Sequence, residues 1–307
     1  MSDYIDLQVN GYAGVDFNAS DLTLDEFNRA ARTILSDGTA QFLPTLITAP
    51  WDEMLRKVDQ IATWIDEGKV SNSQVLGLHL EGPFLSPEDG YIGAHPKDAA
   101  IPATVDKAKE LLDSARGHVQ LVTLAPEVDP AGRVTRFFSD RGITVAAGHS
   151  NASRDELACA IDQGLSLYTH LGNGCPAGLP RHDNIIQRVL SLSDRLFVSF
   201  IADGHHVPPV ALANYLRCIP NEHVIIVTDA ISAAGLGAGR YELSGQSVEV
   251  DEDGAAWASC RTHFAGCATP FPRMVGFLKR EIGATDKQVK SWFRDNPLRL
   301  LKRDPKP

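Results

Sequence analysis

Gly77-Leu-His-Leu-Glu-Gly-Pro-Phe84 lies at the end of a run of apolar and small residues that begins at Val75. The run predicts a buried strand that stops at Glu81, because Gly82-Pro83 turns the chain directly afterwards. A carboxylate at the tip of a buried strand is costly unless a metal ion or a catalytic task offsets its desolvation. The same pattern recurs along the chain, where one His, Asp or Asn follows an apolar run.

Eight segments have the near-continuous apolar character of strands that are buried on both faces of a parallel sheet. Helix-compatible segments separate most of them, and residues 23–36 and 51–67 show the clearest helical spacing of apolar residues. A helix after most of eight strands predicts an α/β fold, the (β/α)8 TIM-type barrel, with a doubly wound sheet as the structural alternative. The predicted strands are residues 4–9, 41–48, 75–80, 119–124, 143–147, 165–169, 196–202 and 224–228.

The segment after the eighth predicted strand has a different character. Residues 240–257 contain short strand-like pieces around the turn Asp251-Glu-Asp-Gly254, residues 270–282 and 285–294 have helical patterns, and Pro297 opens a basic tail that we expect to be frayed. We find no repeat or linker that divides the chain. The expected organisation is a single barrel with C-terminal helices over residues 1–300, followed by a flexible tail over residues 301–307.

The composition limits the classes of partner. The 307 residues carry a net charge of −10, which argues against non-specific binding to nucleic acid or to anionic membranes. No apolar run is long enough to span a membrane, and the N-terminal residues lack the pattern of a secretory signal. The 5 cysteines are scattered without a CxxC pair, which is typical of reduced thiols in a cytoplasmic protein.

Strand ends in a barrel meet at one rim, where barrel enzymes carry their chemistry. Glu81, His149 and His170 follow the third, fifth and sixth predicted strands. One carboxylate and two imidazoles, with a fourth position for water, form an open zinc-type catalytic site. Asp229 follows the eighth strand, where a carboxylate is suited to take a proton from the water and deliver it to a leaving amine.

Several polar residues at the same rim have a structural interpretation beside the functional one. A single strand-end histidine is more often a structural hydrogen-bonding group than a ligand, so the argument depends on the whole set. Glu127 is equally compatible with a carboxylate at a helix start, and His205 and His206 cannot both face inward from adjacent positions. The glycine-rich run 233–239 lacks a phosphate-binding pattern and predicts a flexible loop.

The chain resembles the N-acetylglucosamine-6-phosphate deacetylase family of the amidohydrolase superfamily in motifs that occur in order over about residues 4–235. Any one of the motifs is weak, but the ordered set is highly specific. The motifs are Ile5-Asp-Leu-Gln-Val-Asn-Gly11, Leu78-His-Leu-Glu-Gly-Pro-Phe84, Gly93-Ala-His-Pro96, Thr123-Leu-Ala-Pro-Glu127, Ala147-Gly-His-Ser-Asn-Ala152, Thr169-His-Leu-Gly-Asn173, Ala202-Asp-Gly-His-His206 and Val227-Thr-Asp-Ala230.

The resemblance implies a deformed (β/α)8 barrel that removes the acetyl group from an amino-sugar phosphate. It supports the three metal ligands and the proton-transfer role of Asp229 named above, and it implies a homodimer in which an arginine reaches across the interface. The implied substrate-binding groups are His95 over the sugar and acetyl group, and Asn173, the backbone at Gly174, Arg181 and His206 around the phosphate and sugar.

The same comparison predicts one divalent metal ion in each subunit. Relatives with two metals in the superfamily have a His-x-His pair after the first strand, whereas Gln8 and Asn10 stand there in this chain. Neutral amides are poor ligands beside imidazole. Zinc suits the Glu/His/His/water set, and iron, manganese or cobalt also fit it.

The chain departs from the family pattern at its ends and in two loops. The family usually builds a small β-sandwich from longer ends, so we expect that sandwich to be absent or reduced to residues 240–257. Cys267 lies where the family more often has serine, and residues 90–93 differ near the substrate. The alternatives are therefore the hydrolysis of another N-acyl or cyclic amide, and a non-catalytic protein that binds a sugar phosphate.

Overall fold

The centre of the molecule is a ring of parallel strands, in a computed structural model that describes residues 3–71, 73–261 and 263–302. The ring closes where Val9 pairs with Ala230 in parallel and where Asn10 N donates to Ala230 O over 2.7 Å. The predicted barrel is confirmed, and the doubly wound alternative is excluded because an open sheet does not join its first and last strands. The strands run in the order β1 (Tyr4–Val9), β4 (Thr39–Ile47), β5 (Leu78–Glu81), β6 (Val119–Leu124), β7 (Thr144–Ala147), β8 (Leu165–Tyr168), β9 (Phe197–Ile201) and β10 (Val224–Val227).

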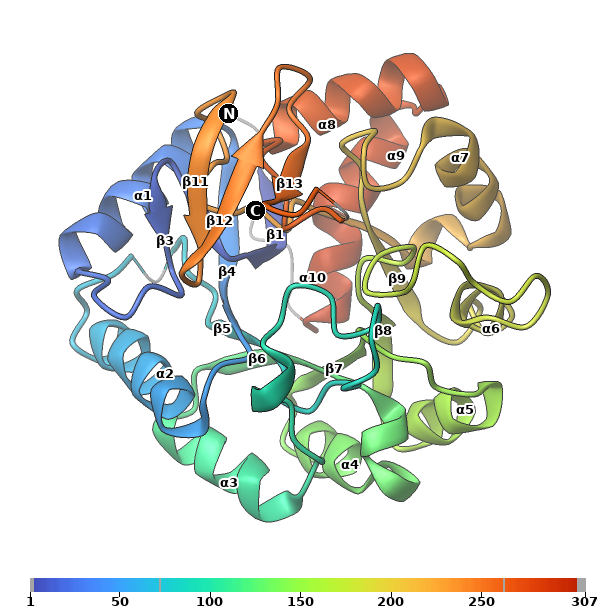
Figure 1. The fold of residues 1–307 in the computed structure, drawn as a ribbon, viewed down its shortest axis with the longest axis horizontal. Helices are drawn as coiled ribbons and strands as arrows, with labels where there is room; N and C mark the ends of the chain where they lie inside the picture. Colours follow the sequence, from blue (N-terminus) through green and yellow to red (C-terminus); the bar gives the residue numbers. More distant parts are fainter. Residues whose placement is uncertain (1–2, 72, 262, 303–307) are drawn as a thin grey trace.

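Helices surround the ring, as Figure 1 shows. The first of them illustrates why: Thr23 and Glu26 form a capping box, and the helix buries Phe27, Ala31 and Ile34 on one face. Burial of a side chain such as Phe27 contributes about 1.5–3 kcal/mol. The helices are α1 (Leu24–Ser36), α2 (Trp51–Asp66), α3 (Val105–Ser114), α4 (Arg133–Ser139), α5 (Arg154–Asp162), α6 (Ile185–Leu190), α7 (Pro209–Cys218), α8 (Phe271–Phe277), α9 (Asp286–Lys290) and α10 (Asn296–Leu300).

Short helical turns complete the connections. π-helical turns continue α8 over Leu278–Ile282 and α9 over Ser291–Asp295, so the two predicted C-terminal helices are present with irregular ends. The 3₁₀ turns are Lys97–Ala99, Pro126–Val128, Pro130–Gly132 and Asn221–His223.

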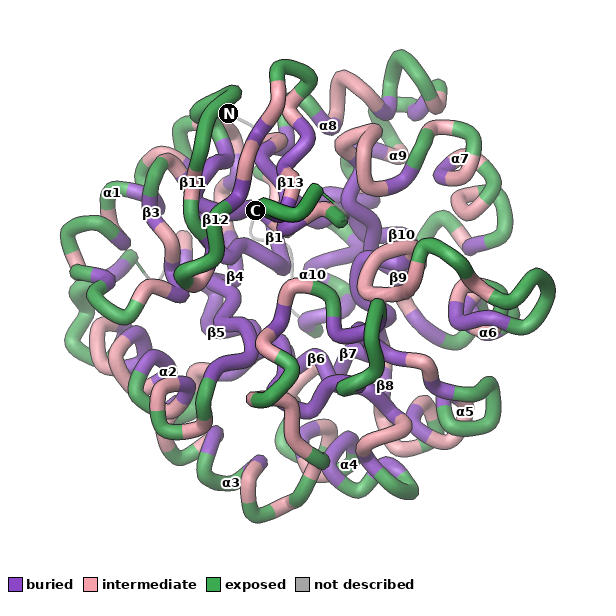
Figure 2. Tube along the Cα trace, viewed as in Figure 1, coloured by how far each residue is buried: buried purple, intermediate pink, exposed green. Residues whose placement is uncertain are grey.

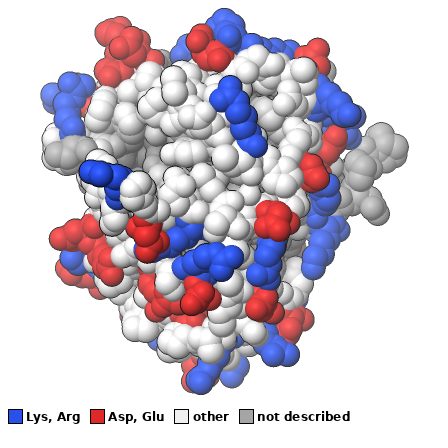
Figure 3. Space-filling view, turned by 90° about the vertical axis from the view of Figure 1, so that its right-hand side faces the viewer, with Lys and Arg blue, Asp and Glu red and all other residues white. Residues whose placement is uncertain are grey.

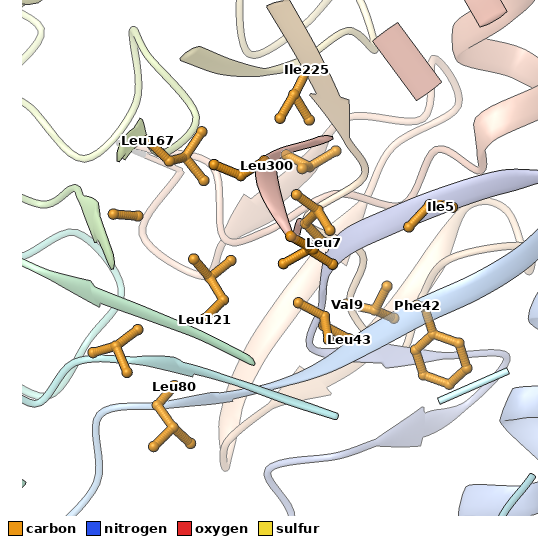
Figure 4. Close-up of a cluster of buried hydrophobic side chains, with 14 of the residues drawn as sticks. Ile5, Leu7, Val9, Phe42, Leu43, Leu80, Leu121, Leu167, Ile225 and Leu300 are labelled. Carbon is orange, nitrogen blue, oxygen red and sulfur yellow. The ribbon is translucent and has the colours of Figure 1, made fainter. Parts of the chain in front are cut away.

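The hydrophobic core fills the barrel interior and the layer between strands and helices. Figure 2 shows the strands buried and the outer helix faces exposed. Figure 4 shows Leu7, Leu43 and Leu121 from three different strands pointing toward one another, with Leu300 of α10 among them. These buried contacts explain why the strands have apolar residues at consecutive positions rather than at alternate ones.

Helix α10 corrects the prediction that the chain frays from Pro297 onward. Asn296 Nδ2 donates to Asn221 O at 2.9 Å and to Val224 O at 2.6 Å, which ties the helix to the beginning of β10. Leu298 and Leu300 are buried against the barrel. The basic residues suggested a tail, but the leucines between them face the core. Of the predicted tail, residues 303–307 lie outside the described part of the chain.

Two small antiparallel sheets lie outside the ring. One is the hairpin of β2 (Gly11–Tyr12) and β3 (Val15–Asp16). The other consists of β11 (Gly239–Leu243), β12 (Gln246–Val250) and β13 (Ala256–Ala258), and confirms the strand-like pieces predicted after the eighth strand. Its buried residues Leu243, Val248 and Ala256 pack with Ile47 and Ile231 near the carboxyl ends of β4 and β10. The β11–β13 sheet therefore covers one side of the rim formed by the carboxyl ends of the strands.

The surface carries both signs of charge. Figure 3 shows acidic and basic side chains interspersed on one side face of the molecule. Among the described residues, no helix has the length and apolar character needed to cross a membrane.

Candidate active site

A cavity of about 700 Å³ opens at the carboxyl ends of the strands. This volume is in the range of small-molecule sites. Glu81 of β5 contributes to its lining, together with His149 after β7, His170 after β8 and Asp229 after β10. The structure therefore brings together at one rim the four residues that the sequence singled out. The other polar lining residues include Asn10, His95, Asn173, His206 and His263.

Three of the four residues have an unusual backbone. His149, His170 and Asp229 each lie two positions after a strand and have φ values of 50°, 31° and 51°. Side chains with a Cβ rarely adopt this left-handed conformation, and such strain tends to cluster at functional sites. His149 and His170 lie against the Glu81 carboxylate, and Asp229 is linked to it through Gln8.

The Glu81 carboxylate is the point on which the polar groups converge. Its Oε1 lies 3.0 Å from His170 Nε2 and 3.4 Å from His149 Nε2, and it accepts a hydrogen bond of 3.0 Å from Gln8 Nε2. Burial alone would raise the pKa of Glu81, but the contacts with His149 and His170 outweigh it and hold that pKa well below its ordinary value. The carboxylate is therefore anionic and close to two imidazoles.

The environment of His149 fits a metal ligand. Its Nδ1 lies 2.9 Å from Tyr91 O, and because a carbonyl only accepts, Nδ1 carries the proton. In the neutral ring Nε2 then has a lone pair that faces the Glu81 carboxylate. Two acceptors that face each other require a shared proton or a cation between them. A histidine that donates its other N–H to a carbonyl is a common arrangement at metal centres.

Two glycines leave space for the imidazole ring of His149. A Cβ built on Gly93 or on Gly174 would lie 3.0 Å from an atom of this ring. Gly174, predicted to contact substrate through its backbone, also lines the cavity. Larger residues at either position would press on the imidazole and move its Nε2.

His170 and His95 complete the group of imidazoles. His170 Nδ1 is buried and has no hydrogen-bond partner among the described residues. Burial would lower the pKa of His170, but the contact with Glu81 reverses the shift and raises it. His95 Nε2 lies 3.8 Å from Glu81 Oε2, and burial followed by the charge of His149 lowers the pKa of His95 to about 3. Ligand atoms of Glu81, His95 and His149 all lie within 4.8 Å of one another, so His95 stands nearer to the centre than a substrate contact alone requires.

Asp229 is held by two neutral amides. Asn10 Nδ2 donates to its Oδ1 at 2.7 Å, and Gln8 Nε2 donates to the same oxygen at 3.1 Å. Burial, with the charge of Glu81 as the next cause, raises the pKa of Asp229 to about 6. Gln8 therefore links the two carboxylates. Gln8 and Asn10, which stand in place of a His-x-His pair, both lie within hydrogen-bonding distance of the Asp229 carboxylate.

The remaining predicted residues divide into two groups. Asn173 and His206 line the cavity, and Asn173 Nδ2 donates to His170 O at 3.2 Å. His206 faces inward while His205 Nε2 lies 3.1 Å from Asp253 O in the turn before β13, as the adjacency of the two histidines required. Arg181 is exposed, and it is not among the residues that line the cavity of its own chain, within the part that the structure describes.

Glu127 has a structural task. Its two oxygens accept hydrogen bonds of 2.6 Å from Ser150 Oγ and from Asn151 N. These bonds hold the loop that follows His149. The structural interpretation of this carboxylate is therefore the one that its contacts support.

Sequence reasoning missed several residues of the site. Asp203 accepts a hydrogen bond of 2.7 Å from His206 Nδ1, and its position at a strand end was the available signal. Trp257 and Phe264 form an aromatic wall of the cavity, with ring centroids 4.3 Å apart. Cys267 packs beside Asp203, and burial raises the pKa of its thiol well above the ordinary value. No local pattern links a loop after β13 to the end of β9, so these contacts were not predictable.

Comparisons with known proteins agree with this geometry. No protein-family model matches the chain. It is 38% identical over 309 residues to N-acetylglucosamine-6-phosphate deacetylase of Homo sapiens, an alignment that covers 97% of this chain and 73% of the human protein. It is 32% identical over 298 residues to N-acetylgalactosamine-6-phosphate deacetylase of Escherichia coli O157:H7, with 97% of this chain and 77% of that protein covered.

A solved structure is similar over nearly the whole chain. It is a mutant N-acetyl-D-glucosamine-6-phosphate deacetylase of Mycobacterium smegmatis in complex with N-acetyl-D-glucosamine-6-phosphate. It superposes with a TM-score of 0.87 at 28% identity, and the match covers 98% of this chain and 77% of that one.

Proposed function

The chain belongs to the N-acetylglucosamine-6-phosphate deacetylase family, and we propose that it hydrolyses the N-acetyl amide of N-acetylglucosamine 6-phosphate to glucosamine 6-phosphate and acetate. One observation carries the proposal beyond the family resemblance. A buried carboxylate, two imidazoles and a second carboxylate converge at the rim of the cavity, and Gln8 bridges the two carboxylates.

The donor set suits one divalent cation, held by Glu81, His149 and His170. The convergence of His149 Nε2 and His170 Nε2 on Glu81 Oε1 supports this assignment, as does the contact of His149 Nδ1 with Tyr91 O, which leaves Nε2 as the ligand atom. When bound, such an ion supplies Lewis acidity toward the acetyl carbonyl and lowers the pKa of a water molecule. Zinc prefers this mixture of one oxygen and two nitrogen ligands with an open position, and iron, manganese and cobalt accept it as well.

Asp229 moves the proton. Its pKa of about 6 places it near the pH at which a carboxylate can both accept and return a proton. It accepts a proton from the attacking water and donates it to the sugar nitrogen as the C–N bond breaks. Asn10 and Gln8 donate to Oδ1 and so fix the orientation of the carboxylate, which gives Asp229 a constant position during both transfers.

The substrate is held by the other lining residues. We assign the sugar and acetyl group to His95 and the sugar phosphate to Asn173, the backbone at Gly174 and His206, all of which line the cavity. His206 Nδ1 donates a hydrogen bond to Asp203, which leaves Nε2 on the opposite edge of that ring for an anionic ligand.

A homodimer is part of the proposal. The cavity of one chain lacks a guanidinium among its described lining residues, and Arg181 lies exposed nearby on the segment after Leu179, which does line it. Arg181 of a second copy would supply the charge-assisted, bidentate contact that a phosphate prefers. The cytoplasm is the proposed location, because all five cysteines are free thiols, as is usual for intracellular proteins.

The second candidate substrate is N-acetylgalactosamine 6-phosphate, which the name of the relative from Escherichia coli favours. Metal analysis of the purified protein, combined with acetate release from the two sugar phosphates and from a cyclic amide, tests the proposal. We expect one cation per chain and faster release from N-acetylglucosamine 6-phosphate. A metal-replete protein that releases no acetate from either sugar phosphate would contradict the proposed reaction.

A further inference from the structure

A second cluster of metal-ligating side chains lies at the edge of the cavity, and consists of Asp203, His206 and Cys267. His206 Nδ1 donates to Asp203 Oδ2 at 2.7 Å, and Cys267 Sγ donates to the same oxygen at 3.5 Å. The other oxygen of Asp203, Oδ1, accepts the backbone N–H groups of His205 and His206 at 2.8 and 2.9 Å. The carboxylate is therefore anchored through Oδ1, while two protons converge on Oδ2.

The cluster is buried and rigidly supported. The side chains of Asp203 and His206 are 2% and 5% exposed, and Cys267 is 1% exposed. Cys267 N donates to Asp229 O and Ile231 N donates to Cys267 O, both at 3.0 Å, so the backbone of Cys267 is paired with the end of β10. Thr269 N also donates to Cys267 Sγ at 3.2 Å. An outer N–H that supports a ligand atom in this way is typical of metal centres.

We propose that Asp203, His206 and Cys267 form a second cation site, which takes a thiophilic divalent ion such as Zn²⁺ or Cd²⁺ and whose occupation inhibits the enzyme. One oxygen, one nitrogen and one sulfur ligand suit such ions. The ligand atoms all lie within 4.8 Å of one another. The inhibition rests on the proposed function, whereas the binding does not.

Two of the three ligand separations can be compared directly with those around a zinc ion. Around a tetrahedral zinc ion, a sulfur and an oxygen ligand lie about 3.6 Å apart, and a nitrogen and an oxygen ligand about 3.4 Å apart. The Sγ–Oδ2 separation of 3.5 Å already matches, and the Nδ1–Oδ2 separation of 2.7 Å has to widen. A small rotation of the His206 ring supplies that difference.

The protons on Cys267 and on His206 Nδ1 have to leave when the ion binds. Binding breaks the S–H bond of Cys267 and releases that proton to solvent. His206 contacts an anion through Nε2–H while Nδ1–H donates to Asp203, so on binding the ion the ring releases its Nδ1 proton to solvent and keeps the proton at Nε2, while Asp203 remains ionised. The ion thus replaces both protons that now converge on Oδ2.

Occupation changes the site in two ways. His206 lines the cavity, so rotation of its ring moves Nε2, and loss of the Nδ1 proton removes the positive charge of the ring; both changes weaken its contact with an anionic substrate. Cys267 N donates to the main-chain carbonyl of Asp229, so a shift of Cys267 toward the ion also strains the backbone that positions the proton-transfer residue. We therefore expect inhibition that is partly competitive with the sugar phosphate and reversed by a chelator.

The test titrates the metal-loaded protein with Cd²⁺ and follows the ultraviolet charge-transfer band of cadmium thiolate. Cd²⁺ that exchanges into the Glu81 site meets only oxygen and nitrogen ligands and produces no such band. We expect one band-forming ion per chain in the unmodified protein and in Cys175→Ser, a control that removes a thiol elsewhere on the cavity wall. In Cys267→Ser we expect loss of the band and an affinity more than about 100-fold lower, since loss of an outer-shell partner alone costs 10–100-fold.

Thermal unfolding of Cys267→Ser, with Cys267→Ala as a second variant, checks that the fold is kept. A band that persists in both Cys267 variants, or one that disappears in Cys175→Ser, would overturn the assignment. Acetate release is measured in the same samples, where Cys267→Ser should resist inhibition by Cd²⁺. A band without any deacetylase activity would refute the proposed function and leave the cation site standing, whereas activity without a band would refute the cation site alone.

Discussion

Asn10 donates a hydrogen bond of 2.7 Å to Asp229 Oδ1, across the seam at which β1 meets the end of β10 and the barrel closes. The contact joins the residues that follow the first and the last strand of the ring. It makes the position of the proposed proton-transfer group depend on closure of the barrel. The amide N–H of Asn10 stabilises the ionised form of that carboxylate.

Asp229→Asn should abolish turnover and keep the metal. Loss of general acid–base catalysis typically costs 10²–10⁴-fold, and with both proton transfers affected we expect kcat to fall by at least about 10³-fold. The measurement is kcat for acetate release together with the metal content. Asp155→Asn, at an exposed position in the first turn of α5, is the matched control. Near-normal deacetylation by Asp229→Asn would refute the role of this residue.

Glu81→Gln should empty the metal site. A neutral amide is a poor ligand beside two imidazoles, and Glu81 is the carboxylate on which His149 and His170 converge. We expect the metal content after dialysis to fall from about one ion per chain to nearly none, with loss of activity. Circular dichroism checks the fold. An active, metal-replete Glu81→Gln protein would contradict the assignment of this ligand.

Asn10→Ala should shift the acidic limb of the pH dependence of kcat/KM. Asp229 has to be ionised to accept a proton, so kcat/KM falls as the pH drops below the pKa of this group, which burial and Glu81 raise to about 6 in the metal-free protein. Asn10 stabilises the ionised form, and a hydrogen bond to a charged group contributes about 1.5–3 kcal/mol. Its loss should therefore raise the pKa of Asp229 and shift the limb to higher pH by about one to two units.

The pH dependence of kcat/KM for Asn10→Ala and for the unmodified protein measures this shift. Asn28→Ala, which removes an exposed amide on α1, serves as the control and should leave the limb in place. A limb that stays where it is, or moves to lower pH, would show that Asp229 does not govern it.

Arg181→Ala should raise KM more than it lowers kcat. A charge-assisted contact to phosphate contributes roughly 1.5–3 kcal/mol, so we expect KM to rise by about 10-fold or more with a smaller change in kcat. Mixing this variant with Asp229→Asn distinguishes the two possible geometries. If the arginine acts across a dimer interface, one site of each mixed dimer combines an intact Asp229 with an intact Arg181 and regains normal KM.

The mixed sample is prepared by joint unfolding and refolding, and the two unmixed variants treated in the same way are the controls. No recovery in a sample shown by mass to contain mixed dimers would place Arg181 in the site of its own chain. A monomeric protein with normal KM would contradict the proposed homodimer.

The sequence by itself determined the strands, their parallel arrangement and the four residues at the centre of the rim. Each strand is an apolar run that ends at a polar residue, and both features are local in the chain. Glu81, His149, His170 and Asp229 could be grouped without coordinates because the carboxyl ends of parallel strands in a barrel must meet. Adjacency in the chain likewise predicted that only one of His205 and His206 faces inward.

Only the tertiary structure decided which groups touch. Closure of the ring places Asn10 and Gln8 on Asp229, a loop carries Tyr91 to His149, and the segment after β13 carries Cys267 to Asp203. The basic C-terminal segment also forms a packed helix, α10, and its Leu300 lies in the core. These contacts join residues far apart in the chain, and they depend on loop paths and side-chain packing that no periodicity records, because a pattern of apolar residues reports burial but not the partner that provides it.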